Sequence, residues 1–359
     1  MIVAMKSNQQ LIEASRNLCK ADDYQCPSCK SPVHLKVGAI MRPHFGHYQN
    51  ANCDVFSEGE TAEHIQGKLQ LKQWLEDQEI PVELEAYLPG LRQRPDLLAT
   101  IDNRKIALEF QCSQIPIYKI AERTQGYLNN GYEVIWVLGD NFEWKNQLTA
   151  FQKSCLTNLE DRLVLFHYSV TKKRLSYRYN FTYKQTKKMR HTKKSIKYGQ
   201  KLNLNVTEKR PLQKRAVNTE LEHTKLLRQI TYSKNFGKAF LETLYNQKET
   251  LVSMPKELYE VVPSEWMIHT HGYEWKYQFI LWLEQLPVNS VLTKKNLLQF
   301  VTEVKLHLIP QATTDQLLEP IIEFLAVLTE SGALKQLRLD KWSIKNYPKR
   351  YKYLEEKFK

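Results

Sequence analysis

The sequence predicts an α/β protein with a zinc-ribbon-like N-terminal segment, an αβββαβ core and a mostly α-helical C-terminal domain. Three observations lead to this prediction. The first 56 residues are turn-rich and hold paired cysteines, residues 57–170 alternate between helical and strand-like apolar spacing, and residues 226–359 keep mainly helical spacing. A chain of 359 residues is long enough for two or three domains with a sizeable core.

The charge of the chain is concentrated in one segment. The formal net charge is +13, yet residues 171–230 alone hold 18 Lys and Arg against 3 Asp and Glu, so the remainder is close to neutral. We therefore predict that residues 171–225 form a basic linker or arm that contacts a polyanion such as DNA. A solvated linker without a ligand is the alternative.

Composition argues against membrane and secreted classes. No run approaches 18 apolar residues, so we expect no membrane-spanning helix. The first residues lack the positive charge followed by a long apolar stretch that marks a secretion signal, and six cysteines are few for this length. We expect a protein of the reducing cytoplasm that has no disulfide framework.

The N-terminal segment has the ligands of a zinc site. Cys26-Pro-Ser-Cys29 places two thiolates where one tight turn can present both to a metal ion, and His44, His47 and Cys53 follow. A Cys₃His set predicts a closed, structural Zn²⁺ site. The residues leave the choice between His44 and His47 open. A buried or redox-active cysteine pair and a catalytic zinc site are the alternatives.

The core elements follow from periodicity and from the residues that interrupt it. Ser57 and Glu60 match a capping box, which begins a helix that continues to about Gln78. Asp102-Asn103 is a good hairpin turn, and Gly131 ends a second helix. The other expected elements are short strands over Val33–Val37 and ending near Pro43, core strands over Pro81–Leu88, Arg94–Thr100, Lys105–Gln111 and Tyr132–Leu138, and a helix over 117–130.

Two acids interrupt the apolar sequence of the central strand pair. A carboxylate such as Glu109 in a buried strand is costly unless it is paired or binds a metal. A hairpin centred on Asp102-Asn103 puts Asp96 opposite Glu109, with their Cβ atoms about 4.5–5.5 Å apart. Two carboxylates at that separation suit a hard divalent cation, Mg²⁺ or Mn²⁺.

Other charged residues extend this acid pair. Glu63 and Lys68 on the first helix, and Glu85 on the preceding strand, are further candidates for the site. The alternative is a partly exposed sheet edge at which the two acids form ordinary ion pairs, for instance with Arg94 or Arg104.

A polar stripe on the second helix suggests a nucleic-acid contact. Lys119, Arg123 and Tyr127 are spaced i, i+4, i+8, so they share one face and are expected to contact phosphates and stack on a base. His64, on the stripe of the first helix that also holds Lys68, joins this set. A solvated helix face is the alternative.

The order helix–strand–strand–strand–helix–strand, Pro95-Asp96 and Glu109-x-Gln111 resemble the PD-(D/E)XK (restriction-endonuclease-like) nuclease superfamily. A larger set of motifs, covering residues 1–170, resembles the competence protein CoiA family. These motifs are Cys26-Pro-x-Cys29, His44-Phe-Gly-His47, Ala62-Glu-His64, Gly67-Lys68, Gln93-Arg-Pro-Asp96, Glu109-Phe-Gln-Cys-Ser113, Arg123-Thr-x-Gly-Tyr127 and Trp136-x-Leu-Gly139.

This resemblance implies a function in natural transformation, at a step after DNA entry. It implies that Asp96 and Glu109 hold catalytic Mg²⁺ or Mn²⁺ for phosphodiester hydrolysis of single-stranded or branched DNA, with recombination proteins as further partners. Gln111 stands where the superfamily usually has Lys, and Gln supplies neither a charge nor a base. Lys68 would supply the ammonium from the first helix, and Glu63 would complete the outer shell of the site.

Two other functions remain open at this point. In the first, the nuclease-like core has no catalytic activity and the chain only binds DNA or a recombination partner. Gln111 favours this hypothesis. In the second, helices followed by a β-ribbon over Gly332–Ile344 form a winged helix of a transcription regulator, which leaves the acid pair unexplained.

Overall fold

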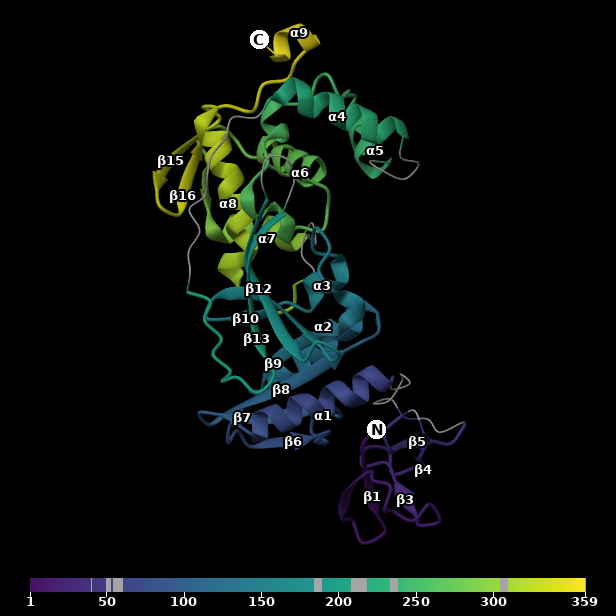
Figure 1. Cartoon of the computed structure of the whole chain (residues 1–359). Helices are drawn as coiled ribbons and strands as arrows, with labels where there is room; N and C mark the ends of the chain where they lie inside the picture. The colour runs from purple at the N-terminus through teal and green to yellow at the C-terminus, as the bar shows by residue number, and fades with distance from the viewer. Residues whose placement is uncertain are drawn as a thin grey trace. The chain divides into compact units, whose positions relative to one another are not determined.

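The computed structural model describes residues 1–39, 41–49, 53, 61–183, 189–207, 218–232, 238–303 and 309–358 (Figure 1). The chain forms two compact units. Unit 1 comprises residues 1–179, 192–208 and 309–311, and unit 2 comprises 180–191, 209–308 and 312–359. The predicted mixed α/β class, with a sheet core and a helical C-terminal region, is confirmed.

Five short strands build the N-terminal part of unit 1. They are β1 (Val3–Lys6), β2 (Leu11–Glu13), β3 (Tyr24–Gln25), β4 (Pro32–Lys36) and β5 (His44–His47), and they form a sheet in the order β2-β1-β3-β4-β5. The strand predicted to end near Pro43 instead begins at His44, because β5 pairs with β4 from Lys36↔His44 to Val33↔His47. Proline has no N–H with which to join such a ladder.

The next elements follow the predicted order helix–strand–strand–strand–helix–strand. They are α1 (Ala62–Glu76), β6 (Val82–Leu84), β7 (Leu97–Ile101), β8 (Arg104–Gln111), α2 (Ile117–Asn129) and β9 (Glu133–Leu138). Ser57 and Glu60, the expected capping box, lie outside the described residues, and Thr61 caps α1 by accepting from the amide of His64 at 3.1 Å. β6 is shorter than predicted, because Glu85 takes a positive φ of 52° and ends the strand.

The hairpin turn fixes the register of the central strand pair. Asp102 and Asn103 have φ values of 48° and 61°, the left-handed conformation that a two-residue type I′ turn requires. β7 and β8 consequently pair as Leu97↔Leu108, so the next position in the ladder brings Asp96 opposite Glu109, as predicted.

The two core helices pack on opposite faces of β8, since neighbouring residues of a strand alternate between faces. Phe110 faces α1, where a Cβ on Gly67 would lie only 2.0 Å from its Cε1 atom. Glu109 faces α2, where it contacts Arg123 and Tyr127. Phe110 therefore packs against α1, and Glu109 points toward α2.

We expect Gly67→Ala to lower the free energy of unfolding by about 1–3 kcal/mol, because the new methyl group overlaps Phe110 and separates α1 from the sheet. In an open helical site the same change would stabilise by about 1 kcal/mol. Gly90→Ala is the control, since a Cβ there meets no heavy atom within 4 Å. Urea denaturation of both variants measures the difference, and equal midpoints would contradict the close packing.

Unit 1 continues through η1 (Asp140–Phe142), α3 (Ala150–Ser154), β10 (Thr157–Leu159), β11 (Arg162–Ser169), β12 (Arg174–Tyr183) and β13 (Met189–Lys197), the last two strands entering unit 2 in part. The large sheet has the order β13-β12-β11-β9-β8-β7-β6, and β10 pairs with β11. Within the expected linker, residues 189–197 form edge strand β13 instead, because Thr192 and Ile196 are buried while Arg190, Lys193 and Lys197 stay exposed.

Unit 2 is mainly helical and has its own apolar core. Its remaining elements are α4 (Thr219–Tyr232), α5 (Lys238–Asn246), η2 (Lys256–Tyr259), η3 (Pro263–Met267), α6 (Gly272–Glu284), β14 (Val291–Thr293), α7 (Lys294–Glu303), α8 (Thr314–Glu330), β15 (Leu334–Arg338), β16 (Lys341–Ile344) and α9 (Leu354–Phe358). The ribbon expected over 332–344 is the hairpin β15–β16, which adds β14 in the order β14-β16-β15. Among the described helices, none has the length and apolar character to cross a membrane.

Candidate functional site

The N-terminal segment gathers three cysteines and one histidine that could bind one metal ion. One ligand atom each from Cys26, Cys29, His47 and Cys53 lies within 4.8 Å of all the others. Cys26 and Cys53 are buried, and the Sγ atom of Cys29 is 3.4 Å from Nε2 of His47. Tetrahedral zinc uses Zn–S bonds of about 2.3 Å and Zn–N bonds of about 2.0 Å, which need ligand atoms this close. The cluster could bind a metal ion such as zinc.

The structure chooses between the two candidate histidines. His47 belongs to the cluster, whereas His44 does not, and Nδ1 of His44 lies 3.0 Å from the carbonyl oxygen of Arg42. The physical reason is strand alternation, since two residues three positions apart in β5 point to opposite faces. Of the two histidines between which the sequence left the choice open, His47 is therefore the one that lies in the described cluster.

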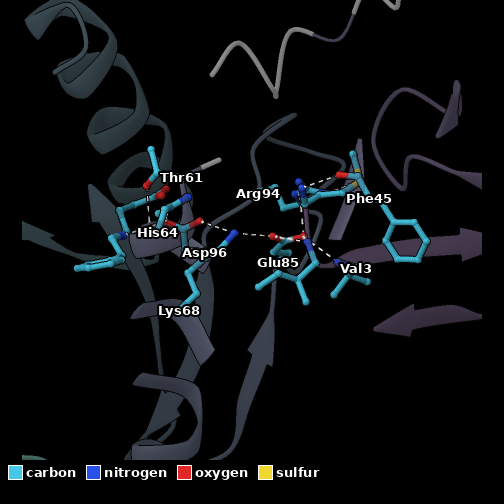
Figure 2. Close-up of polar contacts among 12 residues, drawn as sticks. Val3, Phe45, Thr61, His64, Lys68, Glu85, Arg94 and Asp96 are labelled. Carbon is cyan, nitrogen blue, oxygen red and sulfur yellow. Dashed lines mark hydrogen bonds and ion pairs between the residues drawn. The ribbon is translucent and has the colours of Figure 1, made fainter. Parts of the chain in front are cut away.

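Asp96 directly precedes β7 and lies within reach of α1. Its Oδ2 accepts from the amide of Phe110 at 2.8 Å and lies 3.1 Å from Nε2 of His64, and its Oδ1 lies 3.5 Å from Nζ of Lys68 (Figure 2). Burial acts to raise the pKa of Asp96, but the charges of His64 and Lys68 outweigh it and hold that pKa well below its usual range. Asp96 is thus ionised and surrounded by donors.

Glu109 has the opposite electrostatic character. It is buried, and its Oε1 accepts from the hydroxyl of Tyr127 at 2.6 Å and from the guanidinium of Arg123. Burial raises the pKa of Glu109 to about 7, with Arg123 opposing and the charge of Asp96 adding to the rise. Within the described chain, no hydrogen bond or ion pair uses its other oxygen, Oε2.

The ion pairs at these acids differ from those expected for a simple sheet edge. Arg94 lies 3.6 Å from Glu85, and Arg104 pairs with exposed Glu133 at 3.2 Å. In the part of the chain that the structure describes, the ion pairs of Asp96 and Glu109 are made with the two helices, through His64 and Lys68 on α1 and Arg123 on α2. Sequence spacing along the hairpin could not indicate these partners, because they depend on how α1 and α2 pack on the sheet.

Lys68 and Glu85 form a buried ion pair next to Asp96. Lys68 is 1% exposed, and its Nζ donates to Oε1 of Glu85 at 2.6 Å. Burial acts to raise the pKa of Glu85, but the charges of Lys68 and Arg94 hold it well below its usual range. The amides of Ile2 and Val3 also donate to this carboxylate. Sequence reasoning placed Glu85 near the site but gave no sign of this contact with the first strand.

Glu63 and Gln111 support the end of the sheet. Oε1 of Glu63 accepts from the amide of Asp140 at 2.7 Å, and a Cβ on Gly139 would lie 2.6 Å from that oxygen, so a larger residue there would displace the carboxylate. Gln111 is buried, and its amide group donates to the carbonyl oxygen of Ser113 at 2.8 Å. Both side chains thus hold the turns that follow β8 and β9.

In the stripe on α2, the position of Tyr127 differs from the one that base stacking requires. Tyr127 is 0% exposed with its hydroxyl on Glu109, so the expected stacking on a base does not fit its position. The side chain of Arg123 remains 33% exposed, and Lys119 is half-buried in the first turn of α2. Helical spacing aligned these residues correctly but did not reveal that the stripe faces the sheet.

The donor set at the hairpin fits a hard divalent cation. Asp96 and Glu109 come directly after the Leu97↔Leu108 pair of the ladder, and among the described residues no hydrogen bond or ion pair uses Oε2 of Glu109. Carboxylate oxygens are the ligands that Mg²⁺ and Mn²⁺ prefer. Arg123, His64 and Lys68 compensate the acids in the present arrangement.

Comparisons with known proteins identify the family of the chain. The family model "Competence protein CoiA, nuclease-like domain" matches residues 60–210, and the model "Competence protein CoiA, N-terminal domain" matches residues 5–56. The competence protein CoiA of Bacillus subtilis (strain 168) is 38% identical over 114 residues, which span 32% of this chain and 31%, about a third, of that relative. No solved structure matches the chain. Since the two models together cover more than half of its residues, the chain belongs to the competence protein CoiA family.

Proposed function

We propose that this protein is a divalent-metal-dependent nuclease that processes single-stranded or branched DNA after its uptake in natural transformation. The observation on which the proposal rests is the opposed pair Asp96 and Glu109, with the ammonium of Lys68 beside Asp96. The element order α1–β6–β7–β8–α2–β9 supports a restriction-endonuclease-like core for this pair. Membership of the competence family supports the biological setting.

The residues at the site have distinct tasks in this mechanism. Asp96 and Glu109 would hold Mg²⁺ or Mn²⁺, which polarises a phosphoryl oxygen and acidifies a water molecule. Lys68, fixed between two carboxylates, provides the ammonium that Gln111 lacks and orients the water or the phosphate. Arg123, whose side chain is partly exposed, would bind a phosphate oxygen of the DNA.

The proposed role of the N-terminal cluster is structural. Cys26, Cys29, His47 and Cys53 would form a closed four-ligand zinc site, which leaves no open position for a substrate. A segment of five short strands with a small apolar core of its own needs such a metal for stability.

Incubation with labelled DNA tests the activity. Single-stranded, double-stranded and branched substrates are incubated with the full chain in Mg²⁺, in Mn²⁺ and in EDTA. Cleavage with either metal and none in EDTA is the expected result. Intact substrates under all three conditions, with protein that retains its zinc, would refute the nuclease activity.

A DNA-binding protein without catalytic activity is the second candidate function. The observation that favours it is the pairing of both acids with protein cations, Asp96 with His64 and Lys68 and Glu109 with Arg123. Gln111 in the usual lysine position agrees with it. Tight DNA binding in EDTA together with no cleavage in Mn²⁺ would establish this function and exclude the first.

We expect edge strand β13 to contribute phosphate contacts. Neutralising its exposed Arg190, Lys193 and Lys197 with Gln should lower the slope of log K against log[salt] for single-stranded DNA by about 2, because each contact contributes about 0.7. The triple change Lys20→Gln, Lys256→Gln and Lys295→Gln, all at exposed positions, is the matched control. Fluorescence anisotropy titrations at several salt concentrations measure both slopes. An unchanged slope would contradict phosphate contacts by β13. The basic residues would then only prevent this edge strand from pairing with the strand of another chain.

The C-terminal order α6–β14–α7–α8–β15–β16, with the sheet β14-β16-β15, supports the proposed winged-helix-like module. Its third helix, α8, contains Asp315, Glu319, Glu323 and Glu330 and no Lys or Arg. A helix with this charge repels phosphates, so we propose that it does not read DNA and that this module binds protein partners of recombination.

A further inference from the structure

The nuclease-like core buries a carboxylate that the proposed reaction does not use. Glu85 follows β6 and is 3% exposed, and its amide donates to the carbonyl oxygen of Asp96 at 2.9 Å. Glu85 therefore occupies the ladder position next to Asp96, which is itself opposite Glu109. A buried carboxylate destabilises a fold unless its oxygens are paired, so the partners of Glu85 are informative.

The partners of Glu85 come from two separate segments of the chain. The amide of Ile2 donates to both carboxylate oxygens at 2.9 and 3.0 Å, and the amide of Val3 donates to Oε2 at 3.0 Å. The ammonium of Lys68, from α1, donates to Oε1 at 2.6 Å. Figure 2 shows Glu85 between Val3 on one side and Lys68 on the other. One carboxylate thus fastens the first strand of the N-terminal sheet to the helix beside Asp96.

The N-terminal end of this connection leads to the Cys/His cluster. β1 pairs with β3 through Met5↔Gln25, and Gln25 directly precedes the ligand Cys26. The amide of Phe45, two residues before the ligand His47 in β5, donates to the carbonyl oxygen of Met1 at 2.7 Å. The backbone that offers its amides to Glu85 is therefore held by the same strands that position the metal ligands.

The other end of the connection controls which acid holds the ammonium of Lys68. Lys68 is 1% exposed, so its charge must be shared among nearby carboxylates. Its Nζ lies 2.6 Å from Glu85 but 3.5 Å from Oδ1 of Asp96. Glu85 therefore holds the ammonium in the shorter contact, and Oδ1 of Asp96 keeps only the longer one. A neutral side chain at position 85 would let Lys68 move onto Asp96 and compete with the metal.

We propose that Glu85 is a positioning residue that couples the N-terminal segment, which contains the Cys/His cluster, to the acid pair Asp96 and Glu109. The segment holds the Ile2 and Val3 amides, these amides orient Glu85, and Glu85 sets the distance between Lys68 and Asp96. The inference rests on the proposed cation site at Asp96 and Glu109, but it concerns the geometry of that site rather than cleavage of DNA. It gives the Cys/His cluster a second task, support of the acid site, in addition to stabilising its own segment.

Mn²⁺ affinity of the full chain, measured by electron paramagnetic resonance of the free ion, tests the proposal without DNA. Binding that is lost in Asp96→Asn defines the site. Glu85→Gln is expected to weaken this binding about 10- to 100-fold, as is typical when a partner of a metal ligand is removed. Glu83→Gln is the matched control, since it makes the same chemical change two residues earlier, at an exposed position within β6. Glu85→Asp, which keeps the charge, should restore part of the affinity.

A double-mutant cycle tests the link to the cluster. Cys26→Ser should weaken Mn²⁺ binding as much as Glu85→Gln, and the double variant should be no weaker than either, because both changes break one connection. If Cys26→Ser does not fold, Val3→Pro replaces it in the cycle, since it removes one amide donor and no side chain of the site. Additive effects would overturn the coupling.

The outcomes separate this inference from the proposed nuclease activity. Metal-dependent cleavage by the wild type, with equal Mn²⁺ affinity in wild type and Glu85→Gln, overturns the inference and leaves the activity standing. Weaker Mn²⁺ binding in Glu85→Gln, with no cleavage by the wild type, supports the inference and counts against the activity. A wild type that binds no Mn²⁺ overturns both.

Discussion

Asp96→Asn and Glu109→Gln should each reduce metal-dependent DNA cleavage by roughly three orders of magnitude. A metal at a phosphoryl centre supplies several kcal/mol of transition-state stabilisation, and each 1.36 kcal/mol is worth about tenfold in rate. Either change removes one of two opposed carboxylates, so the remaining acid holds the cation poorly. Rates of cleavage of a labelled oligonucleotide at saturating Mn²⁺ give the comparison.

The controls make the same chemical changes outside the site. Asp102→Asn lies in the turn of the same hairpin, and Glu133→Gln is exposed at the start of β9. Both should cleave at the wild-type rate. Full activity in either acid variant would show that the acid pair is not the metal site, whereas loss in a control would point to damage of the hairpin.

The two acid variants should differ in stability when metal is removed with EDTA. The ionised form of Asp96 is favoured, because the charges of His64 and Lys68 outweigh the effect of burial. Asp96→Asn should therefore lower the free energy of unfolding by about 2 kcal/mol. The pKa of Glu109 is raised to about 7 from an ordinary 4.5, chiefly by burial. Its contribution to stability therefore falls as pH rises from about 4.5 to 7, and Glu109→Gln should be neutral or stabilising at pH 8. Denaturation curves at pH 5 and pH 8 test both signs.

Loss of the Cys/His metal should unfold the N-terminal segment. Structural zinc contributes about 10–16 kcal/mol in zinc-finger peptides, and the apolar core around Cys26 is small. Cys26→Ser and His47→Ala should therefore lose zinc and expose residues 1–49 to protease. Plasma mass spectrometry of the purified chain, with limited proteolysis, measures both effects.

His44→Ala is the matched control for this prediction, because His44 lies in the same strand but outside the cluster. It should retain one zinc per chain and the wild-type proteolysis pattern. Wild-type protein purified without chelator that contains no zinc, or zinc that is lost in His44→Ala and kept in His47→Ala, would contradict the assignment.

Local features of the sequence were sufficient to predict the hairpin and the grouping of Cys26 and Cys29 in one cluster. The Asp102-Asn103 turn sets the register of β7 and β8, because a two-residue turn determines which residues face each other, so the opposition of Asp96 and Glu109 follows from the chain itself. The spacing of Cys26 and Cys29 similarly indicates one tight turn that can present both thiolates to the same metal ion. Periodicity predicted the order of α1, α2 and the strands between them, although it overestimated the length of β6.

Only the tertiary structure decided what surrounds these residues. His47 was selected over His44 by the face of β5 that meets the cysteines, and Tyr127 is buried because the α2 stripe packs on Glu109. The contact of Glu85 with Ile2 and Val3 joins residues more than 80 positions apart, which no local pattern encodes. Turn residues and apolar periodicity determine the helices, the strands and their register. The partners of a buried charge depend on long-range packing instead, because a carboxylate removed from water can pair only with donors that the neighbouring elements place beside it.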